Sequence, residues 1–565
     1  MPRPRLRRLS FALLPVATVV ALLQPVAGSA KAPPPAGPVV GANNLVDLDH
    51  GLQFPQNKQN EPAITRDPLT GVLVAGANDE RDNPLCHDVT TPLTSPCPFV
   101  STPESPEQIS GFYVSRNNGA SWTGGYLTGY DNQGIRRASG GDPSLDYGPA
   151  RCSDKTFAYS CGVTIYYANL ADPINPDQHF SEAVAVSRTH NDGSTWELPS
   201  VVNALDKTSD FDDHEWIAVD KVAGSLHFGR VYLFIAIYCG ECSGTGNVKL
   251  MVVHSDDEAV TWSAPVQVSA ANNNKAQGFR ETGQMAVAAD GTVEVFWTEN
   301  ADSPKLPSLQ VVATSKDGGN TFTSPITIAR VTDYPLRGTP FDAVDLFNRV
   351  PGMSARVDCY PHPAADTSID PLTNKPRSRV FVVWCDFGGG HGVVKGAVSS
   401  DGLSWTPLGT LGTIAQISGR NAFFPQVSVD PSGIVNVAFD ALTAPPPDNP
   451  WQTGIQVYDN YFVQSTNGST FSSPLRVSTA SSNPDGSSYN NLQEQFIGDY
   501  IGIVSGLGAA YIVWTDTRNA APCDLVNAYR NAVYAGSKTA VAPNPDRVCA
   551  TNFGNTDTYE ATVSY

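Results

Sequence analysis

Charge is scarce in this 565-residue sequence, because Asp, Glu, Lys and Arg make up only 16% of it, against about 25% in an average globular domain. Positive charge is scarcer still: 36 Lys and Arg face 55 Asp and Glu, which leaves a formal net charge of −19. Such a chain has no basic field to displace counterions from phosphate groups. We therefore expect no nucleic-acid partner.

Signature motifs of several enzyme classes are also missing. The sequence contains no P-loop, no dinucleotide-binding fingerprint, no HExxH zinc motif and no GxSxG nucleophile turn. No apolar run reaches the about 20 residues that cross a bilayer as a helix. We therefore expect neither nucleotide-dependent chemistry nor a transmembrane segment.

The first thirty residues have the layout of a secretory signal peptide. Four arginines precede an apolar run from Phe11 to Leu23, and small residues follow up to Ala30. We assign residues 1–30 to the signal peptide and residues 31–50, which include the stiff stretch APPPAGP, to a Pro/Gly-rich linker. The mature protein is expected to be secreted.

Ten cysteines fit that oxidising compartment, where an even count favours disulfides over free thiols. Proximity in the sequence suggests five local bridges: Cys86–Cys97, Cys152–Cys161, Cys239–Cys242, Cys359–Cys385 and Cys523–Cys549. The Cys239 and Cys242 pair also has the spacing of half a zinc site, although no second such pair accompanies it.

A repeated unit organises the rest of the chain. Each copy starts with a hairpin, in which a short alternating apolar strand, a turn containing Asp or Gly and a second strand rich in Val, Phe and Trp follow one another. Seven hairpins begin near Glu61, Asp142, Glu215, Gln284, Tyr360, Phe424 and Phe496. After each of the first six, a third strand leads into a second repeated element.

That second element is a short turn that closes on an aromatic residue. Its six copies are SRNNGASW (115–122), THNDGSTW (189–196), SDDEAVTW (255–262), SKDGGNTF (315–322), SSDGLSW (399–405) and STNGSTF (465–471). They resemble the Asp-box, or BNR repeat, of sialidases and related β-propellers. In such a turn Ser and Asp or Asn side chains bond the backbone, and Gly supplies a positive φ. Six copies therefore indicate a structural role.

Four antiparallel strands in each repeat are typical of a propeller blade, because radial stacking leaves few sheet edges exposed. We predict an all-β fold with a single β-propeller domain spanning residues 51–565. The seven hairpins favour seven blades, whereas the six repeated turns leave six blades as the alternative. One chain end is expected to close the ring by pairing with a strand from the other end.

Strand direction decides which residues share a face. The repeated turns and the hairpin turns fall on one face, and the starts of first strands and the ends of second strands fall on the other. The second face collects a carboxylate-rich rim: Asn60, Glu61, Asp142, Asp213, His214, Glu215, Arg280, Glu281, Asp358, Asp499 and Tyr500 from the starts, and Asp79, Glu80, Arg81, Glu299, Asp386, Asp440, Asp516 and Arg518 from the ends. We expect the functional site there, since polar groups converge from several blades.

The resemblance implies a sialidase-like glycoside hydrolase acting on extracellular glycans. Sialidases clamp the substrate carboxylate with three arginines and use Tyr, activated by Glu, as nucleophile and Asp as acid/base. Their first arginine opens an Arg-Ile-Pro segment that is missing here, because Asn60 occupies its place. The shared face suggests a substitute set: Arg81, Arg280 and Arg518 as the clamp, and Tyr500 as nucleophile with Glu281 or Glu215 as partner.

Other interpretations use the same rim. In a hydrolase with two carboxyl groups, Glu61, Asp142, Glu215 and Glu281 are the candidates for acid and base. A lyase would need a base such as His214, which with Asp499 completes the expected substrate-binding residues. Alternatively, the secreted propeller binds a glycan or a protein without catalysis. In either case the expected partner is an extracellular glycan or glycoprotein. Calcium is a possible cofactor because it prefers oxygen ligands. We expect a monomer.

Overall fold

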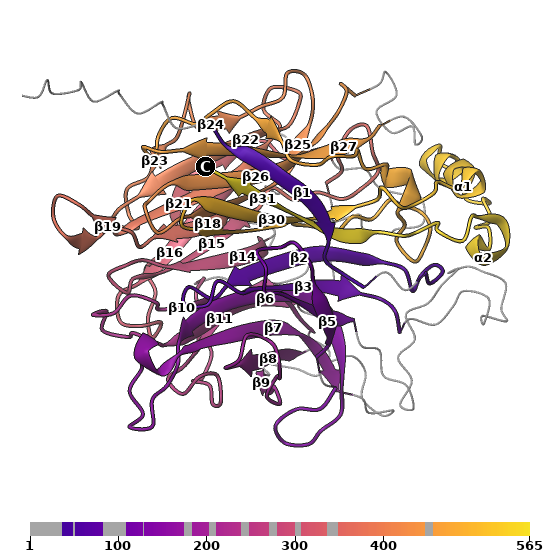
Figure 1. The fold of residues 1–565 in the computed structure, drawn as a ribbon. Helices are drawn as coiled ribbons and strands as arrows, with labels where there is room; N and C mark the ends of the chain where they lie inside the picture. Colours follow the sequence, from indigo (N-terminus) through magenta and orange to yellow (C-terminus); the bar gives the residue numbers. More distant parts are fainter. Residues whose placement is uncertain are drawn as a thin grey trace, which may run out of the picture. The chain divides into compact units, whose positions relative to one another are not determined.

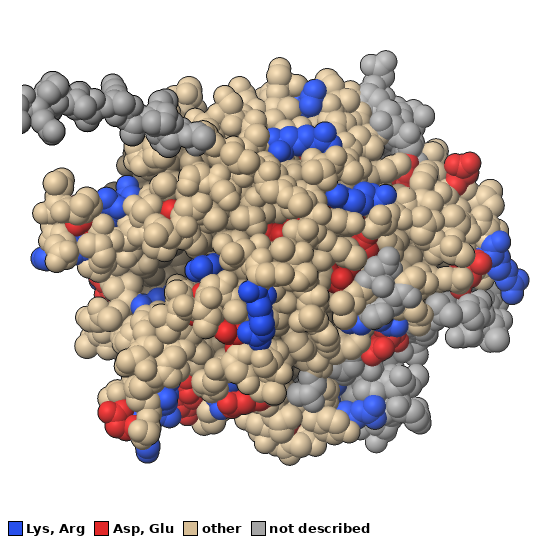
Figure 2. Space-filling view, viewed as in Figure 1, with Lys and Arg blue, Asp and Glu red and all other residues tan. Residues whose placement is uncertain are grey.

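The computed structural model describes residues 37–48, 51–82, 109–127, 129–173, 183–202, 211–238, 248–269, 280–299, 307–335, 348–446 and 456–565. One compact unit spans Pro38–Tyr565, and the description below concerns this unit. It consists almost entirely of antiparallel strands (Figure 1). None of its described helices is long and apolar enough to traverse a membrane. Charged side chains are few and scattered on the face shown in Figure 2.

Four consecutive four-stranded sheets form the first four blades. Blade 1 contains β2 (Gln59–Arg66), β3 (Leu73–Asp79), β4 (Ser110–Ser115) and β5 (Thr123–Tyr126). Blade 2 contains β6 (Arg137–Pro149), β7 (Val163–Pro173), β8 (Ala183–Thr189) and β9 (Ser200–Val202). Blade 3 contains β10 (Phe211–Val219), β11 (Val231–Tyr238), β12 (Val248–Ser255) and β13 (Val266–Gln267). Blade 4 contains β14 (Arg280–Val287), β15 (Val293–Glu299), β16 (Ser308–Ser315) and β17 (Ile326–Val331).

Three further sheets complete the set. Blade 5 contains β18 (His362–Asp366), β21 (Arg379–Asp386), β22 (Val393–Ser399), β23 (Thr406–Pro407) and an added β24 (Thr413–Ala415). Blade 6 contains β25 (Ala422–Val429), β26 (Val435–Leu442), β27 (Tyr458–Ser465) and β28 (Leu475–Arg476). Blade 7 contains β29 (Gly502–Gly506), β30 (Ala509–Asp516), β31 (Asp557–Ser564) and β1 (Val39–Leu45).

Short elements lie between these strands. A two-stranded ribbon, β19 (Ile369–Asp370) and β20 (Lys375–Pro376), extends the first hairpin of blade 5. Among the described residues, the 3-10 helices η2 (Tyr159–Cys161) and η3 (Pro484–Gly486) and the α-helices α1 (Asp524–Tyr534) and α2 (Pro545–Val548) occupy connections. Both α-helices follow β30, so they belong to the insertion between the second and third strands of blade 7.

The innermost strands form a closed ring. Each of β2, β6, β10, β14, β18 and β25 contacts the innermost strand of the next blade, and β29 returns to β2. The structure is therefore a seven-bladed propeller, as predicted. Large apolar side chains such as Phe296, Trp384, Phe423 and Trp514 fill the space between sheets. A central channel of about 230 Å³ is lined by residues of all seven innermost strands.

An N-terminal strand closes the ring. Strand β1 pairs antiparallel with β31 as the outermost strand of blade 7. The prediction that one chain end pairs with the other is confirmed. The linker expected over residues 31–50 is wrong for residues 39–45, because this strand has a partner that lies more than 500 positions away and leaves no local signal. The signal-peptide assignment lies outside the described residues.

Disulfides tie three connections together. The structure contains Cys152–Cys161, Cys359–Cys385 and Cys523–Cys549, which confirms three of the five expected bridges. The expected pairs Cys86–Cys97 and Cys239–Cys242 lie outside the described residues. The middle bridge joins the segment before β18 to the end of β21, so it fixes one hairpin at the face that carries the acidic rim.

In all six repeated turns the hydroxyl of the first Ser or Thr donates to the Asp or Asn side chain two residues later. In the fourth copy, Ser315 Oγ donates to Asp317 Oδ1 (2.8 Å) and accepts from the backbone N–H of Gly319 (2.8 Å). The same carboxylate accepts from the backbone N–H of Thr321 (2.9 Å) and from its hydroxyl (2.6 Å). In the third copy Ala259 replaces the glycine and keeps the positive φ of 60°. The pattern survives because side chains, not the glycine, hold the turn.

Strand register places the repeated turns and the acidic rim at opposite ends of a blade. In blade 4, Val293 at the start of β15 pairs with Ser315, which opens the repeated turn. Glu281 instead pairs with Thr298 near the end of the same strand. The two faces derived from strand direction are therefore those of the structure.

The turn at Asp317 provides a pH-dependent contribution to stability. Burial acts to raise the pKa of Asp317, but hydrogen bonds from Thr321, Ser315 and Asn320 outweigh it and lower the pKa to about 2. Because the folded-state pKa lies below the unfolded value, this contribution is present above pH 4 and is lost as the pH falls toward 2. Asp317→Ala should cost about 1 kcal/mol at pH 7 in urea denaturation.

Asp317→Asn is the matched control, since Asn191 and Asn467 hold the equivalent position in other turns. We expect this variant to retain stability at pH 7 within about 0.5 kcal/mol and to lose less stability than the wild type between pH 4 and pH 2. Equal losses in both proteins over that interval would show that Asp317 is not responsible.

Candidate functional site

Four innermost strands begin with the same irregularity. Residues Glu61, Asp142, His214 and Phe424 have positive φ values of 53°, 54°, 51° and 50°. At each of them the pairing between the first and second strands shifts by a bulge. A bulge turns a side chain away from the direction that regular pleating would give it. Non-glycine residues rarely adopt this conformation, and it clusters at functional sites.

The bulged residues of blades 1, 2 and 3 meet acidic residues of blades 5 and 7. We call this group the axial cluster; its members are Glu61, Asp142, Asp213, His214, Glu215, Arg356, Asp358, Asp499 and Tyr500. The charge of Asp142 acts on Glu61, and the charges of Asp213 and Asp499 both act on Asp142. Five blades therefore contribute to one site, as the rim of the sequence analysis predicts.

Arg356 provides the guanidinium of the axial cluster. Its Nε and Nη2 donate to the two carboxylate oxygens of Asp499 at 2.7 and 2.5 Å, and Nη2 lies 3.6 Å from Glu61 Oε1. The guanidinium also lies 4.8 Å from the centre of the Phe496 ring. Burial acts to lower the pKa of Arg356, but the carboxylates of Asp499 and Glu61 outweigh it and raise this pKa. The arginine is thus already engaged in the free protein.

Burial and mutual repulsion raise the pKa of several acids of the cluster. Burial, with the charges of Asp142 and Asp499, raises the pKa of Glu61 well above its usual value. Burial also raises the pKa of Asp142 and of Asp213 to about 6, and that of Asp358 to about 8. The pKa of His214 is lowered by burial. Carboxyl groups in contrasting environments are typical of acid–base sites.

A small cavity adjoins the cluster. Its lining residues are Asp142, Pro143, His214, Glu215, Trp216, Gly283, Gln284, Tyr360 and Tyr500. Trp216 and Tyr500 also line the central channel. These two residues therefore lie where the small cavity and the channel are adjacent. The Tyr500 hydroxyl donates to the carbonyl of Pro143 at 3.5 Å, and burial followed by the charge of Asp142 raises its pKa well above the usual value.

Six of the ten residues predicted for the site come together in the axial cluster: Glu61, Asp142, His214, Glu215, Asp499 and Tyr500. Two arginines of the predicted clamp lie elsewhere. Arg81 Nη2 binds Asp79 Oδ2 at 2.6 Å and its guanidinium stacks 4.2 Å from the Tyr126 ring in the outermost strand of its own blade.

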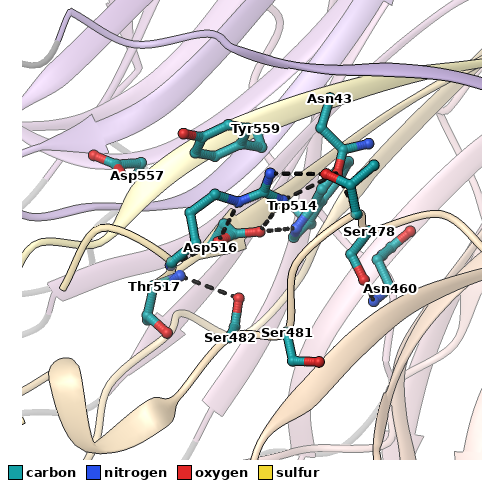
Figure 3. Close-up of polar contacts among 12 residues, drawn as sticks. Asn43, Asn460, Ser478, Ser481, Ser482, Trp514, Asp516, Thr517, Asp557 and Tyr559 are labelled. Carbon is teal, nitrogen blue, oxygen red and sulfur yellow. Dashed lines mark hydrogen bonds and ion pairs between the residues drawn. The ribbon is translucent and has the colours of Figure 1, made fainter. Parts of the chain in front are cut away.

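Arg518 repeats this arrangement in blade 7. Its guanidinium binds Asp516 (2.7 Å) and Asn43 Oδ1 (3.0 Å), and it stacks 3.9 Å from the Tyr559 ring. Figure 3 shows Asp516, Asn43 and Tyr559 around this position, with Trp514 donating to Asp516. Arg81 and Arg518 thus hold outer strands against the ends of their blades. For Arg280 and Glu281 the structure gives the backbone alone, in β14.

Three side chains of the cluster also have the spacing of a metal site. One ligand atom from each of Asp142, Asp213 and His214 lies within 4.8 Å of the others. Two carboxylates and an imidazole form a donor set that divalent cations accept.

Comparison with known proteins adds a similarity of fold. No protein-family model matches the chain, and no curated protein matches it either. Similar solved structures include a leech intramolecular trans-sialidase (11% identity, TM-score 0.39, covering 68% of this chain and 65% of that chain). A GH93 α-L-arabinofuranosidase of Fusarium graminearum (12%, 0.41, 73% and 94%) and a Hadza microbial sialidase (14%, 0.36, 85% and 94%) are others. Sialidases are thus among the similar structures, but the strand pairing alone establishes the propeller, and this similarity says nothing about activity.

Arg356 is a member of the site that no sequence pattern predicts. It lies in the irregular connection between β17 and β18, where no strand pattern predicts which way a side chain points. Asp213 and Asp358 belong to the predicted rim but not to the proposed catalytic set. The pairing of an arginine with an acid more than 140 residues away leaves no signal in a single sequence.

Proposed function

We propose that the protein is a secreted glycoside hydrolase that cleaves glycosidic bonds of extracellular glycans at the axial cluster. The convergence of carboxyl groups from blades 1, 2, 3, 5 and 7 carries this proposal, and two of these acids, Asp142 and Glu215, line a small cavity. Hydrolysis of a glycoside requires one carboxyl group to protonate the leaving oxygen and another to activate water or attack the sugar. The three disulfides support an extracellular location.

Glu61 is the acid in this proposal and Glu215 is its partner. Burial, with the charges of Asp142 and Asp499, raises the pKa of Glu61 well above its usual value, so as a neutral acid it has a proton to give to the leaving oxygen as the bond to the anomeric carbon breaks. Glu215 lines the cavity beside Tyr500. Its carboxylate either takes a proton from the attacking water or bonds to the anomeric carbon itself.

We infer a substrate without a carboxylate of its own. The arginine of the cluster and a neighbouring arginine are already bound to acids, Arg356 to Asp499 and Arg349 to Glu494. Arg81 and Arg518 are bound to acids of their own blades. A sialic acid would therefore meet several carboxyl groups and two neutralised guanidinium groups, which disfavours its binding.

A panel of aryl glycosides tests this function. Purified mature protein is incubated with 4-nitrophenyl glycosides of neutral sugars, including arabinofuranose, galactose and xylose, and with a fluorogenic sialoside. We expect release from at least one neutral glycoside and none from the sialoside. Faster release from the sialoside would overturn the inferred substrate charge.

A binding propeller without catalysis is the second candidate. It is favoured by the burial of the proposed pair, since Glu61 is 2% and Glu215 is 4% exposed. Glycan-array binding without cleavage of any bound glycan, detected by mass spectrometry, would establish the binder and exclude the hydrolase.

A further inference from the structure

The open side of the axial cluster is formed by three side chains on two adjacent innermost strands. Asp142 lies in β6, and Asp213 and His214 lie in β10. Unlike Glu61 and Asp499, these three are partly exposed, with 26% of the Asp213 side chain and 16% of the His214 side chain accessible. An ion from solution therefore has a route to them.

The atoms of Asp142, Asp213 and His214 that could bind a metal ion lie close together. The backbone N–H of His214 donates to Asp213 Oδ1 at 2.8 Å, which holds that carboxylate in place. Its other oxygen, Oδ2, lies 3.7 Å from His214 Nε2. The bulges at Asp142 and His214 bring the donor atoms of both strands within 4.8 Å of one another. Contraction of these separations to about 3.4 Å would place the atoms as they lie around a tetrahedral zinc ion.

Two buried polar atoms in the lining of the small cavity have no hydrogen-bond partner among the described residues. The Tyr360 hydroxyl and Gln284 Oε1 belong to residues that are 3% and 4% exposed, and neither atom has a hydrogen-bond partner among the described residues. Both residues line the small cavity with Asp142 and His214. An unsatisfied buried polar atom costs about 1–3 kcal/mol. The cavity, of about 20 Å³, has room for about one water molecule, and as a ligand of the ion that water would donate to both atoms.

We propose that Asp142, Asp213 and His214 bind one divalent transition-metal ion, with zinc preferred over calcium. The imidazole nitrogen decides the preference, because zinc accepts nitrogen and carboxylate ligands in a four-coordinate site, whereas calcium takes six to eight oxygen ligands. With three protein ligands, such a site keeps an open position, which is typical of catalytic rather than structural zinc.

The role of the ion rests on the proposed function, but the test of ion binding does not. Beside Glu61 and Glu215, the ion would offset the negative charge of two carboxylates and bind hydroxyl groups of a sugar, so it would orient the substrate. Binding of the ion itself is measured without any substrate.

The test uses the mature full-length protein after treatment with EDTA and dialysis. Isothermal titration with zinc chloride, manganese chloride and calcium chloride gives the stoichiometry and affinity for each ion. We expect one equivalent of zinc, bound at least tenfold more tightly than calcium. The variants Asp213→Asn and His214→Gln should each weaken zinc binding at least tenfold, and thermal denaturation verifies that they are folded.

His190→Gln is the matched control, because this histidine also lies between two carboxylates, 3.0 Å from Glu197 and 3.2 Å from Glu258, on the opposite face. It should bind zinc as the wild type does. No zinc binding by the folded wild type, or binding that survives His214→Gln and is lost in His190→Gln, would overturn the proposal. Zinc binding without cleavage of any glycoside would leave the metal site standing and refute the hydrolase, whereas cleavage by protein that binds no zinc would do the reverse.

Discussion

Glu61→Gln is expected to lower kcat/KM on the best glycoside about 1,000-fold, within the range of general acid catalysis. The amide cannot give up a proton to the leaving oxygen, yet it has the size of the carboxyl group that it replaces. Its oxygen can still accept from Asn78 Nδ2, which donates to Glu61 Oε2 at 2.6 Å. The fold and the bulge of β2 should therefore be retained, and the loss should appear in kcat.

Glu294→Gln controls for the loss of a buried carboxyl group as such. Glu294 is 2% exposed, and burial with the charges of Asp290 and Asp401 raises its pKa to about 8. It lies at the end of blade 4 that carries the repeated turns, because it pairs with Thr314. We expect unchanged kcat/KM. A Glu61→Gln variant as active as this control would remove Glu61 from the mechanism.

Replacing Arg356 by Met should destabilise the protein by about 3–5 kcal/mol, since it leaves a buried carboxylate without its partner. Asp499 is 2% exposed, and the Arg356 guanidinium donates a hydrogen bond to each of its two carboxylate oxygens. Glu61 loses the same neighbour. The midpoint of urea denaturation at pH 7 measures this loss.

Arg230→Met offers a comparison with the same geometry in a different environment. Arg230 binds both oxygens of Asp256 at 2.8 Å, but the Asp256 side chain is 64% exposed. Water replaces the lost partner there, so we expect a cost of about 1 kcal/mol or less. Similar midpoints for the two variants would mean that the axial cluster is not a desolvated charge network.

The sequence contains most of the information on the fold because each blade repeats the same local signals. The alternating hairpin strands and the turns at positions such as Asp317 depend on near neighbours, so a single sequence reveals them. Strand direction then assigns Glu61 and Asp499 to one face without coordinates. Strand β1 escapes this reasoning, since it owes its place in blade 7 to pairing with β31 at the far end of the chain.

The candidate site is less accessible to such reasoning. The three arginines of a substrate clamp must lie on the same face of the propeller. Arg81 and Arg518 meet that condition, but their side chains turn toward Tyr126 and Tyr559 in outer strands. Tertiary contacts decide where a long side chain ends. Arg356 shows the converse, because a residue in an irregular connection reaches the centre of the site through contacts that no periodicity encodes.

A crystal structure of the Glu61→Gln variant with the oligosaccharide form of its best glycoside tests the central claim most directly. We predict that the bond to be cleaved lies between Glu215 and the amide at position 61, at the acidic end of the axis. A sugar bound instead among the repeated turns or in the central channel beyond Trp216 and Tyr500 would contradict it.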